Sequence, residues 1–145
     1  EGPGSSWKAL REELTMEINW VALRLKALEA TKNSYSPYSN YPVGAAAIVD
    51  DGRVISGANV ENASYGLTLC AECSMIGELF ATGGGKLVAF SCVDAQGVVI
   101  MPCGRCRQLL SEHAAAGMML ETVSGIKSIE EVIPDAFGPT DLEEK

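Results

Sequence analysis

Two short cysteine-containing segments carry the residue types that could do chemistry in this chain. In the first, Glu72 follows the thiol of Cys70 by two positions, and the second is the P-C-x-x-C segment Pro102–Cys106. Three thiolates can hold a zinc ion and leave one position open to water, whose pKa the metal lowers towards neutrality. Glu72 would lie beside such a metal without having to bind it, so it could carry protons between water and substrate. The spacing therefore predicts a catalytic zinc centre held by Cys70, Cys103 and Cys106.

Each cysteine segment is also expected to begin a helix. Turn-forming residues precede both segments, and helical patterns follow from Cys70 to about Phe80 and from Cys103 to about His113. A helix N-terminus carries about half a positive charge and presents free N–H groups, and both effects lower a thiol pKa. Two such N-termini facing each other would favour three thiolates before any metal binds.

Cys73 completes a second C-x-x-C and leaves a structural zinc site as an alternative. Pairs of C-x-x-C segments hold structural zinc when roughly 15–20 residues separate them. Here the spacer runs from Ser74 to Pro102, which is 29 residues. The long spacer counts against a closed four-cysteine site without excluding it.

The composition limits the class of partner and the setting. A formal net charge of −8 opposes binding to nucleic acid and favours a small soluble substrate. No apolar run reaches about 18 residues, so no membrane span is expected. Five cysteines grouped for metal binding suit a reducing cytoplasm. Residues 1–15 are expected to be an extension or a cloning-derived arm, because 1–6 look like a cloning scar and Met16 could be a native start.

Residues 16–145 are then expected to form a single α/β domain. Strand and helix patterns alternate, which predicts three α/β/α layers around a mixed five-stranded sheet. The expected strands are Val43–Val49, Arg53–Asn59, Leu87–Asp94, Val98–Met101 and Met118–Val123, with a hairpin turn at Asp50-Asp51-Gly52. The expected helices, besides the two at the cysteine segments, are Trp20–Lys32 with Asn19 as N-cap, Ser128–Ile133 with a capping box, and a short one between Trp7 and Leu14.

Several other side chains have plausible roles. The tyrosine-rich loop 34–42 could pack or could stack on a planar ligand. Glu61 could accept from ligand hydroxyls, whereas Asn59 could simply serve a turn. Cys92 is expected to be buried and inert within its strand. His113, the only histidine, is expected to be a cation at its helix C-terminus or a surface residue rather than a ligand.

Together these motifs resemble the short, homotetrameric, zinc-dependent cytidine deaminases. The resemblance covers about residues 20–137, and the x-E and P-C-x-x-C elements are the signature of zinc deaminases in general. The matching segments are Tyr35-Ser36-Pro37-Tyr38-Ser39, Val43-Gly44-Ala45-Ala46, Asn59-Val60-Glu61-Asn62, Cys70-Ala71-Glu72, Pro102-Cys103-Gly104-Arg105-Cys106-Arg107-Gln108 and Pro134-Asp135-Ala136-Phe137. That many separated motifs in one order make the resemblance specific.

The resemblance implies a zinc-dependent conversion of cytidine or 2′-deoxycytidine to uridine or 2′-deoxyuridine, as in pyrimidine salvage, in a homotetramer with one zinc per subunit. It implies that Cys70, Cys103 and Cys106 bind zinc and that Glu72 shuttles protons. By the same resemblance, Asn59 and Glu61 match the pair that holds the ribose 3′-hydroxyl, and Ala71 matches the residue whose backbone contacts the base. Tyr41 matches the aromatic ring that stacks on the base. Phe137 matches an aromatic residue that reaches the active site of a neighbouring subunit.

One position departs from the family pattern. The family commonly has Arg directly after the Glu, whereas this chain has Cys73. Zinc with three thiolates carries a net charge of −1, and Arg105 between the last two ligands could supply the missing positive charge. The blasticidin S deaminases, a sister family, share Cys-Gly-Arg-Cys and a non-Arg after Glu, so they are the nearest alternative, although the segment Asn59–Asn62 favours cytidine.

Overall fold

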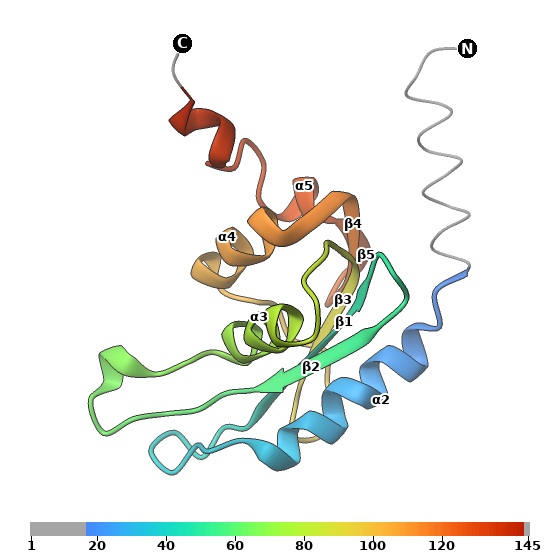
Figure 1. Cartoon of the computed structure of the whole chain (residues 1–145). Coiled ribbons are helices and arrows are strands. Elements are labelled where there is room, and N and C mark those ends of the chain that lie inside the picture. Colours follow the sequence, from blue (N-terminus) through green and yellow to red (C-terminus); the bar gives the residue numbers. More distant parts are fainter. Residues whose placement is uncertain (1–16, 144–145) are drawn as a thin grey trace.

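The computed structural model describes residues 17–143, which form a mixed five-stranded sheet with helices on both faces (Figure 1). The helices are α2 (Trp20–Ala30), α3 (Ala71–Ala81), α4 (Gly104–His113) and α5 (Ile129–Val132). The strands are β1 (Val43–Val49), β2 (Val54–Ala58), β3 (Leu87–Asp94), β4 (Ala114–Thr122) and β5 (Gly125–Ser128). The helix expected between Trp7 and Leu14 and the division at residue 15 lie outside the described residues.

The sheet has the strand order β2-β1-β3-β4-β5. Strand β1 pairs antiparallel with both β2 and β3, β3 pairs parallel with β4, and β4 pairs antiparallel with β5. The parallel step requires a crossover, and α4 provides it between β3 and β4. The α/β class and the mixed five-stranded sheet expected from the sequence are therefore confirmed.

The membership of the sheet differs from the sequence expectation at one strand. The expected strand Val98–Met101 is wrong: it forms a single bridge between Val99 and Val93. Strand β4 pairs with β3 only as far as Phe90, so the edge of β3 after Phe90 is free to form this one bridge. The chain then continues into the second cysteine segment. The fifth strand is instead β5, whose last residue, Ser128, was expected to begin a helix.

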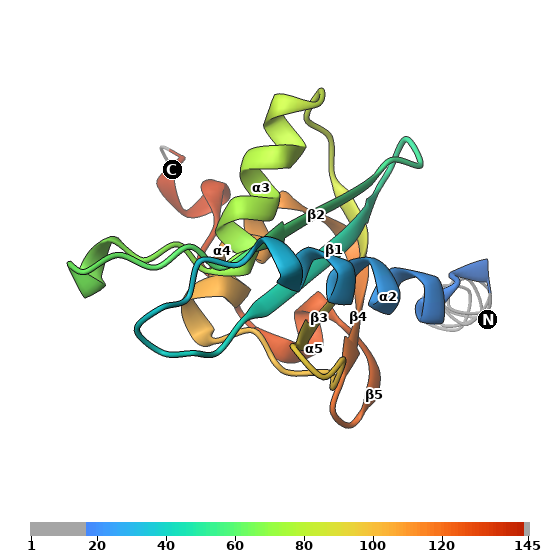
Figure 2. The ribbon, with the colours of Figure 1, turned by 90° about the horizontal axis from the view of Figure 1, so that it is seen from below.

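Two separate layers of side chains cover the two faces of the sheet. Helix α2 covers one face, and α3, α4 and α5 lie on the other, as two perpendicular views show (Figures 1 and 2). The small core under α2 contains Leu23, Ala27, Ala46, Ala89 and Val93, with Trp20 packed against it as expected. The larger core lies under the other three helices. No helix within residues 17–143 has the length and apolar character needed to cross a bilayer.

Glycine in each of the two hairpin strands lets a helix approach the sheet closely. A Cβ on Gly44 would lie 1.9 Å from the carbonyl oxygen of Ala27 in α2. A Cβ on Gly57 would lie 2.4 Å from the backbone nitrogen of Met75 and 2.8 Å from the carbonyl oxygen of Ala71, both in α3. Real Cβ contacts are never this short, so Gly57 fixes where the first cysteine helix begins.

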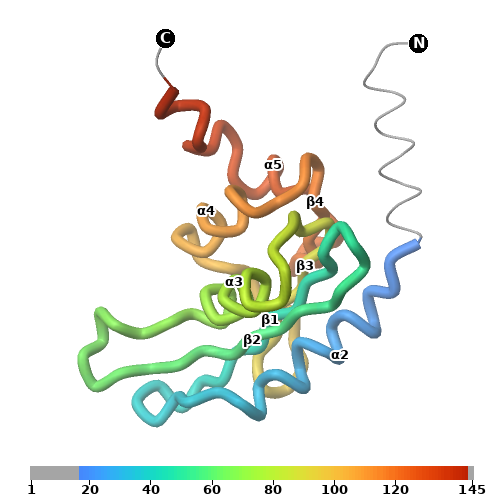
Figure 3. The backbone as a smooth tube through the Cα atoms, in the orientation of Figure 1, coloured from blue at the N-terminus to red at the C-terminus, as the bar shows by residue number. Residues whose placement is uncertain are grey.

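Between β2 and α3 the chain makes a long excursion. Residues 59–70 run out and back as an arm beside the loop 34–42, which the tube trace shows clearly (Figure 3). Bridges between Tyr35 and Val60 and between Val60 and Leu69 hold the base of this arm together. The return of the arm brings Cys70 to the start of α3.

Candidate active site

The two cysteine segments meet where helices α3 and α4 begin. Cys70 is the N-cap of α3 and Cys103 is the N-cap of α4, and the two helices pack against each other on the same face of the sheet. The expected helix starts are therefore confirmed. Sulfur atoms of Cys70 and Cys106 and a carboxylate oxygen of Glu72 all lie within 4.8 Å of one another. Both Glu72 and Cys106 are buried.

A cavity of about 210 Å³ opens beside this cluster. Its lining includes Asn59, Thr68, Ala71, Ile100, Met101 and Cys103. Two sulfur atoms and a carboxylate at this spacing fit zinc, whose usual ligands are thiolate, imidazole and carboxylate. Cys103 lies outside the tight cluster but borders the cavity and interacts with the side chain of Cys106. Cys73 neither joins the cluster nor borders the cavity, which disfavours a closed four-cysteine site.

The three thiols differ in their electrostatic surroundings. Burial raises the pKa of Cys70, and it raises that of Cys106 further, with the nearby Glu72 carboxylate adding to the effect. Cys103 is exposed, and the backbone N–H of Cys106 is the main reason that its pKa is lowered. The expectation that helix N-termini alone favour three thiolates therefore holds only for Cys103. At the other two positions burial outweighs the helix, so the positive charge of a metal is needed to deprotonate them.

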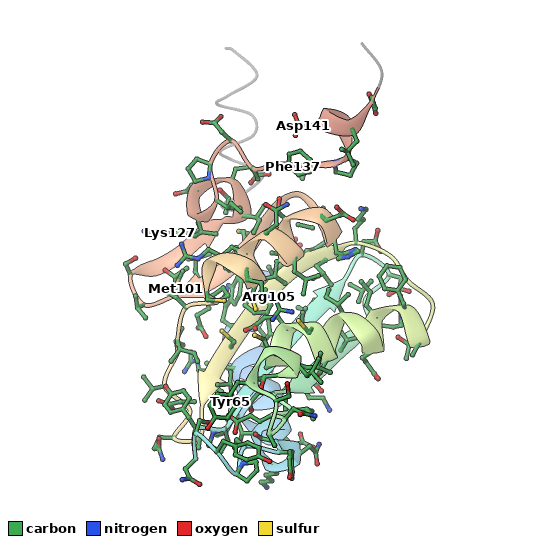
Figure 4. The ribbon with its side chains drawn as sticks, turned by 90° about the vertical axis from the view of Figure 1, so that its left-hand side faces the viewer. Tyr65, Met101, Arg105, Lys127, Phe137 and Asp141 are labelled. Carbon is green, nitrogen blue, oxygen red and sulfur yellow. The ribbon has the colours of Figure 1, made fainter. Side chains whose placement is uncertain are left out.

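Arg105 reaches from α4 to the first of the three cysteines. Its Nη1 donates to the sulfur of Cys70 at a distance of 3.8 Å, and the side chain is otherwise exposed. In Figure 4 the labelled Arg105 reaches from α4 towards the start of α3. Cys73, which occupies the position of the family's usual arginine, is half-buried on α3.

Asn59 and Glu61 both hold the loop 34–43 in place. The Asn59 oxygen accepts from Ser34 Oγ at 2.6 Å and from the Val43 backbone at 2.9 Å, and its nitrogen donates to the Tyr41 carbonyl at 2.9 Å. Glu61 accepts from Ser39 and from the Tyr38 backbone, and the Ser39 hydroxyl is the main cause of its lowered pKa. Asn59 therefore has one amide hydrogen left to donate to a ligand. The carboxylate of Glu61 can still accept a further hydrogen bond from a ligand.

Thr68 connects the two parts of the site. It borders the metal-side cavity that Asn59 lines, and it also borders a second cavity of about 260 Å³. Glu61, Tyr38 and Tyr65 line this second cavity. The sequence did not predict Thr68, Ile100 and Met101 as part of the site, because nothing in their type or spacing distinguishes them from ordinary loop residues.

Two of the expected substrate contacts lie apart from the cavity within this chain. Tyr41 is 49% exposed and Phe137 is 58% exposed, and neither side chain borders the cavity. The carbonyl of Phe137 accepts from Gln108 Nε2 at 2.7 Å, and Figure 4 shows Phe137 well separated from Arg105. Ala71, by contrast, is buried at the first position of α3 and lines the cavity.

His113 is not part of this site, as expected. Its ring packs edge-to-face on Phe80 with a centroid distance of 5.2 Å. Burial lowers its pKa, so the alternative of a helix C-terminal cation is disfavoured.

Comparison with known proteins agrees with this geometry. Residues 20–122 match the family described as the cytidine and deoxycytidylate deaminase zinc-binding region. A cytidine deaminase of Mycobacterium tuberculosis is 52% identical over 126 residues, which cover 87% of this chain and 95% of the relative. One of Halalkalibacterium halodurans is 38% identical over 123 residues, covering 81% and 92% of the two chains.

The solved structures lead to the same family. The crystal structure of cytidine deaminase from Mycobacterium leprae aligns with a TM-score of 0.80 and 56% identity, over 82% of this chain and all of that one. The Mycobacterium tuberculosis structure aligns with a TM-score of 0.81 and 52% identity, over 84% and 99%. Fold, thiol cluster and sequence identity thus agree, and the chain belongs to the cytidine deaminase family.

Proposed function

We propose that this protein hydrolyses cytidine and 2′-deoxycytidine to uridine and 2′-deoxyuridine with release of ammonia, as in pyrimidine salvage. The observation that carries the proposal is the cluster of Cys70, Glu72 and Cys106 beside a cavity that Asn59 also lines. A buried carboxylate next to metal-ligating thiols suits proton transfer at a small planar base. The high identity to proteins named cytidine deaminase supports the same substrate class.

Cys70, Cys103 and Cys106 would hold one zinc per subunit. When bound there, zinc supplies a water of lowered pKa at the cavity wall. Glu72 would take one proton from the attacking water and deliver it to N3 as the water oxygen bonds to C4. It would then move the second proton of that oxygen to the amino group, so that the C4–N bond breaks and ammonia leaves. Atoms balance as cytidine plus water giving uridine plus ammonia. Arg105 offsets part of the negative charge of the three thiolates through Cys70.

The base and sugar contacts follow from the free hydrogen-bonding capacity of the site. The remaining amide hydrogen of Asn59 would donate to the 3′-hydroxyl oxygen, and Glu61 would accept the hydroxyl hydrogen. Ala71 would contact the base through its backbone. A site that satisfies a substrate hydroxyl discriminates strongly against analogues without it, so free cytosine should be a very poor substrate.

A homotetramer is the proposed assembly. The arm 59–70 exposes Tyr65, Leu67 and Leu69 at 75%, 64% and 46%, which is more apolar surface than a protruding loop needs. Tyr41 and Phe137 are exposed as well, and contact with another subunit's base pocket would give both rings a role. Light scattering on the active sample tests this, since a mass equal to one 15.3 kDa chain would refute it.

The setting and the domain boundaries remain predictions. All five cysteines are free thiols, which agrees with a reducing compartment such as the cytoplasm. Residues 16–145 are proposed to form the domain and residues 1–15 an extension. The small cavity and the net charge of −8 support a nucleoside substrate rather than a nucleic acid.

The decisive experiment is an ultraviolet assay of cytidine turnover before and after removal of zinc by a chelator. Turnover should disappear with the metal and return when zinc is added back. Blasticidin S is assayed in parallel, because turnover of that compound without turnover of cytidine would favour the sister family. Free cytosine serves as the control for the sugar contacts.

A further inference from the structure

The base of the arm 59–70 is a short antiparallel pairing with two distinct faces. Val60 and Leu69 form its bridge and exchange two backbone hydrogen bonds, at 2.9 and 2.8 Å. Their side chains are 40% and 46% exposed, and neither borders a cavity of the site. Side chains alternate between the two sides of an extended chain. The residues on either side of this bridge therefore present their side chains to the opposite face.

Four residues flank this bridge and form two cross-strand pairs. Asn59 lies opposite Cys70, and Glu61 lies opposite Thr68. Asn59 and Cys70 line the metal-side cavity, whereas Glu61 lines the second cavity. Thr68 lines both cavities. The pairing thus orders the site from a metal end at Cys70 to a sugar end at Glu61, with Thr68 where the two cavities meet.

The spacing of these residues fits a nucleoside that lies along the pairing. Residues two apart in an extended chain are separated by roughly 7 Å, so Thr68 stands about that far from Cys70. With the base carbon that loses ammonia at the metal end and the 3′-hydroxyl at Glu61, the sugar carbons between them pass Thr68. The 2′-carbon joins the base-bearing carbon to the 3′-carbon. The 2′-hydroxyl therefore comes to the junction of the two cavities.

The Thr68 side chain has a hydroxyl available for such a contact. Its backbone nitrogen donates to the Tyr65 carbonyl at 3.1 Å, which fixes the turn that precedes it. The hydroxyl itself makes no hydrogen bond to any residue among 17–143. Thr68 is also half-buried, so a ligand bound there takes the place of water on this hydroxyl. One donor and two acceptor positions are therefore available to a hydroxyl of a ligand.

We propose that the Thr68 hydroxyl binds the 2′-hydroxyl of ribose and makes Thr68 the residue that distinguishes cytidine from 2′-deoxycytidine. The inference rests on the proposed function, in which Asn59 and Glu61 hold the 3′-hydroxyl. The 2′-hydroxyl takes no part in the chemistry at the base, so its contact with Thr68 is equally strong before and during the reaction. Loss of such a contact raises KM and leaves kcat unchanged.

Two substitutions separate the hydroxyl of Thr68 from its methyl group. Thr68→Val removes the hydroxyl at nearly the same shape, and Thr68→Ser keeps it. In the zinc-loaded full chain, Thr68→Val should raise KM for cytidine about five- to tenfold, the usual effect of losing one hydrogen bond, with kcat within about twofold. KM for 2′-deoxycytidine should change by less than about twofold, because that substrate has no 2′-hydroxyl. Thr68→Ser should match the parent protein on both substrates.

Two controls locate the effect. Thr140→Val makes the same chemical change at an exposed threonine that borders neither cavity, so both KM values should stay at the parent level. The analogue 5′-deoxycytidine keeps the 2′-hydroxyl, so Thr68→Val should raise its KM as much as that of cytidine. Thermal melts check that each variant is folded. If Thr68→Val does not fold, Thr68→Ala removes the hydroxyl with a smaller side chain and is compared with Thr68→Ser.

Three results would overturn the inference. One is an equal rise in KM for cytidine and 2′-deoxycytidine in Thr68→Val, which would mean that the residue only shapes the pocket. Another is an unchanged KM for cytidine in that variant. The third is an effect of Thr68→Val that persists with 2′-deoxycytidine and disappears with 5′-deoxycytidine, which would assign the contact to the other end of the sugar. Absence of turnover of either nucleoside by the zinc-loaded parent protein would instead overturn the proposed function, and the inference with it.

Discussion

Two carboxylates on opposite faces of the sheet, Glu121 and Glu72, differ in how their charge is compensated. On the α2 face, Ser91 donates to Glu121 at 3.0 Å, and Arg24 forms a two-point contact with the same carboxylate at 3.0 and 3.1 Å. On the other face, Glu72 lies beside the sulfur atoms of Cys70 and Cys106, and no cation pairs with that carboxylate within the described residues.

The difference separates a structural carboxylate from one available for chemistry. An arginine fork satisfies Glu121 with two charge-assisted hydrogen bonds. Glu72 lies beside the sulfur atoms of Cys70 and Cys106, so a metal bound there would bring positive charge close to it. A carboxylate beside the proposed metal ligands, without an ion-pair partner among residues 17–143, fits the proposed proton transfer.

The largest expected effect comes from removing each carboxylate's charge in turn. Glu72→Gln should leave zinc bound and reduce kcat for cytidine by at least about 10²–10⁴, the usual worth of a general acid–base group. Glu121→Gln should leave kcat unchanged and lower Tm, because Arg24 loses its charged partner. Zinc analysis measures the metal content, an ultraviolet assay measures kcat, and thermal melts measure Tm. Comparable turnover in Glu72→Gln and Glu121→Gln would remove the distinction between the two faces.

The next comparison uses the glycines that let helices approach each face. Gly57→Ala should displace the start of α3, because the new Cβ would lie 2.4 Å from the Met75 nitrogen. We expect a loss of about 1–3 kcal/mol or more in unfolding free energy, together with reduced zinc affinity and kcat. Gly44→Ala should lower the unfolding free energy at least as strongly, because the new Cβ would collide with α2. It should leave the zinc content of the folded fraction unchanged. Denaturant melts and zinc titration distinguish the two, and equal zinc loss in both would contradict the expectation.

Two arginines give a third and smaller test. Arg105→Ala should lower zinc affinity or kcat about tenfold, typical of a residue that supports metal ligands, while Tm of the zinc-free protein stays the same. Arg24→Ala should instead lower the unfolding free energy by about 1 kcal/mol and leave kcat intact. Arg105→Ala combined with Cys73→Arg should recover activity if positive charge near the thiolates is what matters. Full kcat and zinc affinity in the single Arg105→Ala variant would exclude that role.

The smallest effect concerns His113, at the opposite end of α4 from the thiols. Burial lowers its folded-state pKa below the ordinary value of 6.5. The neutral ring is therefore favoured on folding, and its contribution to stability is complete above pH 6.5 and is lost as pH falls from there through the folded-state pKa. Tm should decrease over this range less in His113→Gln than in the parent protein, with kcat at pH 7.5 equal in both. An identical pH dependence of Tm would show that His113 is not desolvated.

The sequence by itself determined the features that depend on near neighbours along the chain. The N-caps at Asn19 and Ser128, the hairpin after β1 and the helix starts at Cys70 and Cys103 follow from local hydrogen bonding and turn geometry, and the structure has them. Metal-ligand types and spacing are local too, so the zinc family could be identified before the fold was known.

Tertiary structure decided what depends on burial and on distant partners. Burial reversed the expected pKa change at Cys70 and Cys106, because desolvation of a thiolate outweighs a helix N-terminus. The fifth strand is β5 because the chain returns along the outer edge of β4, a pairing that no local pattern encodes. The hydrogen bonds of Arg24 to Glu121 join residues 97 positions apart in the sequence, and only the packing of α2 on the sheet brings them together. Local hydrogen bonds depend on residues that are close in the sequence. Desolvation and long-range contacts depend on the packing of helices against the sheet, so they arise only in the folded protein.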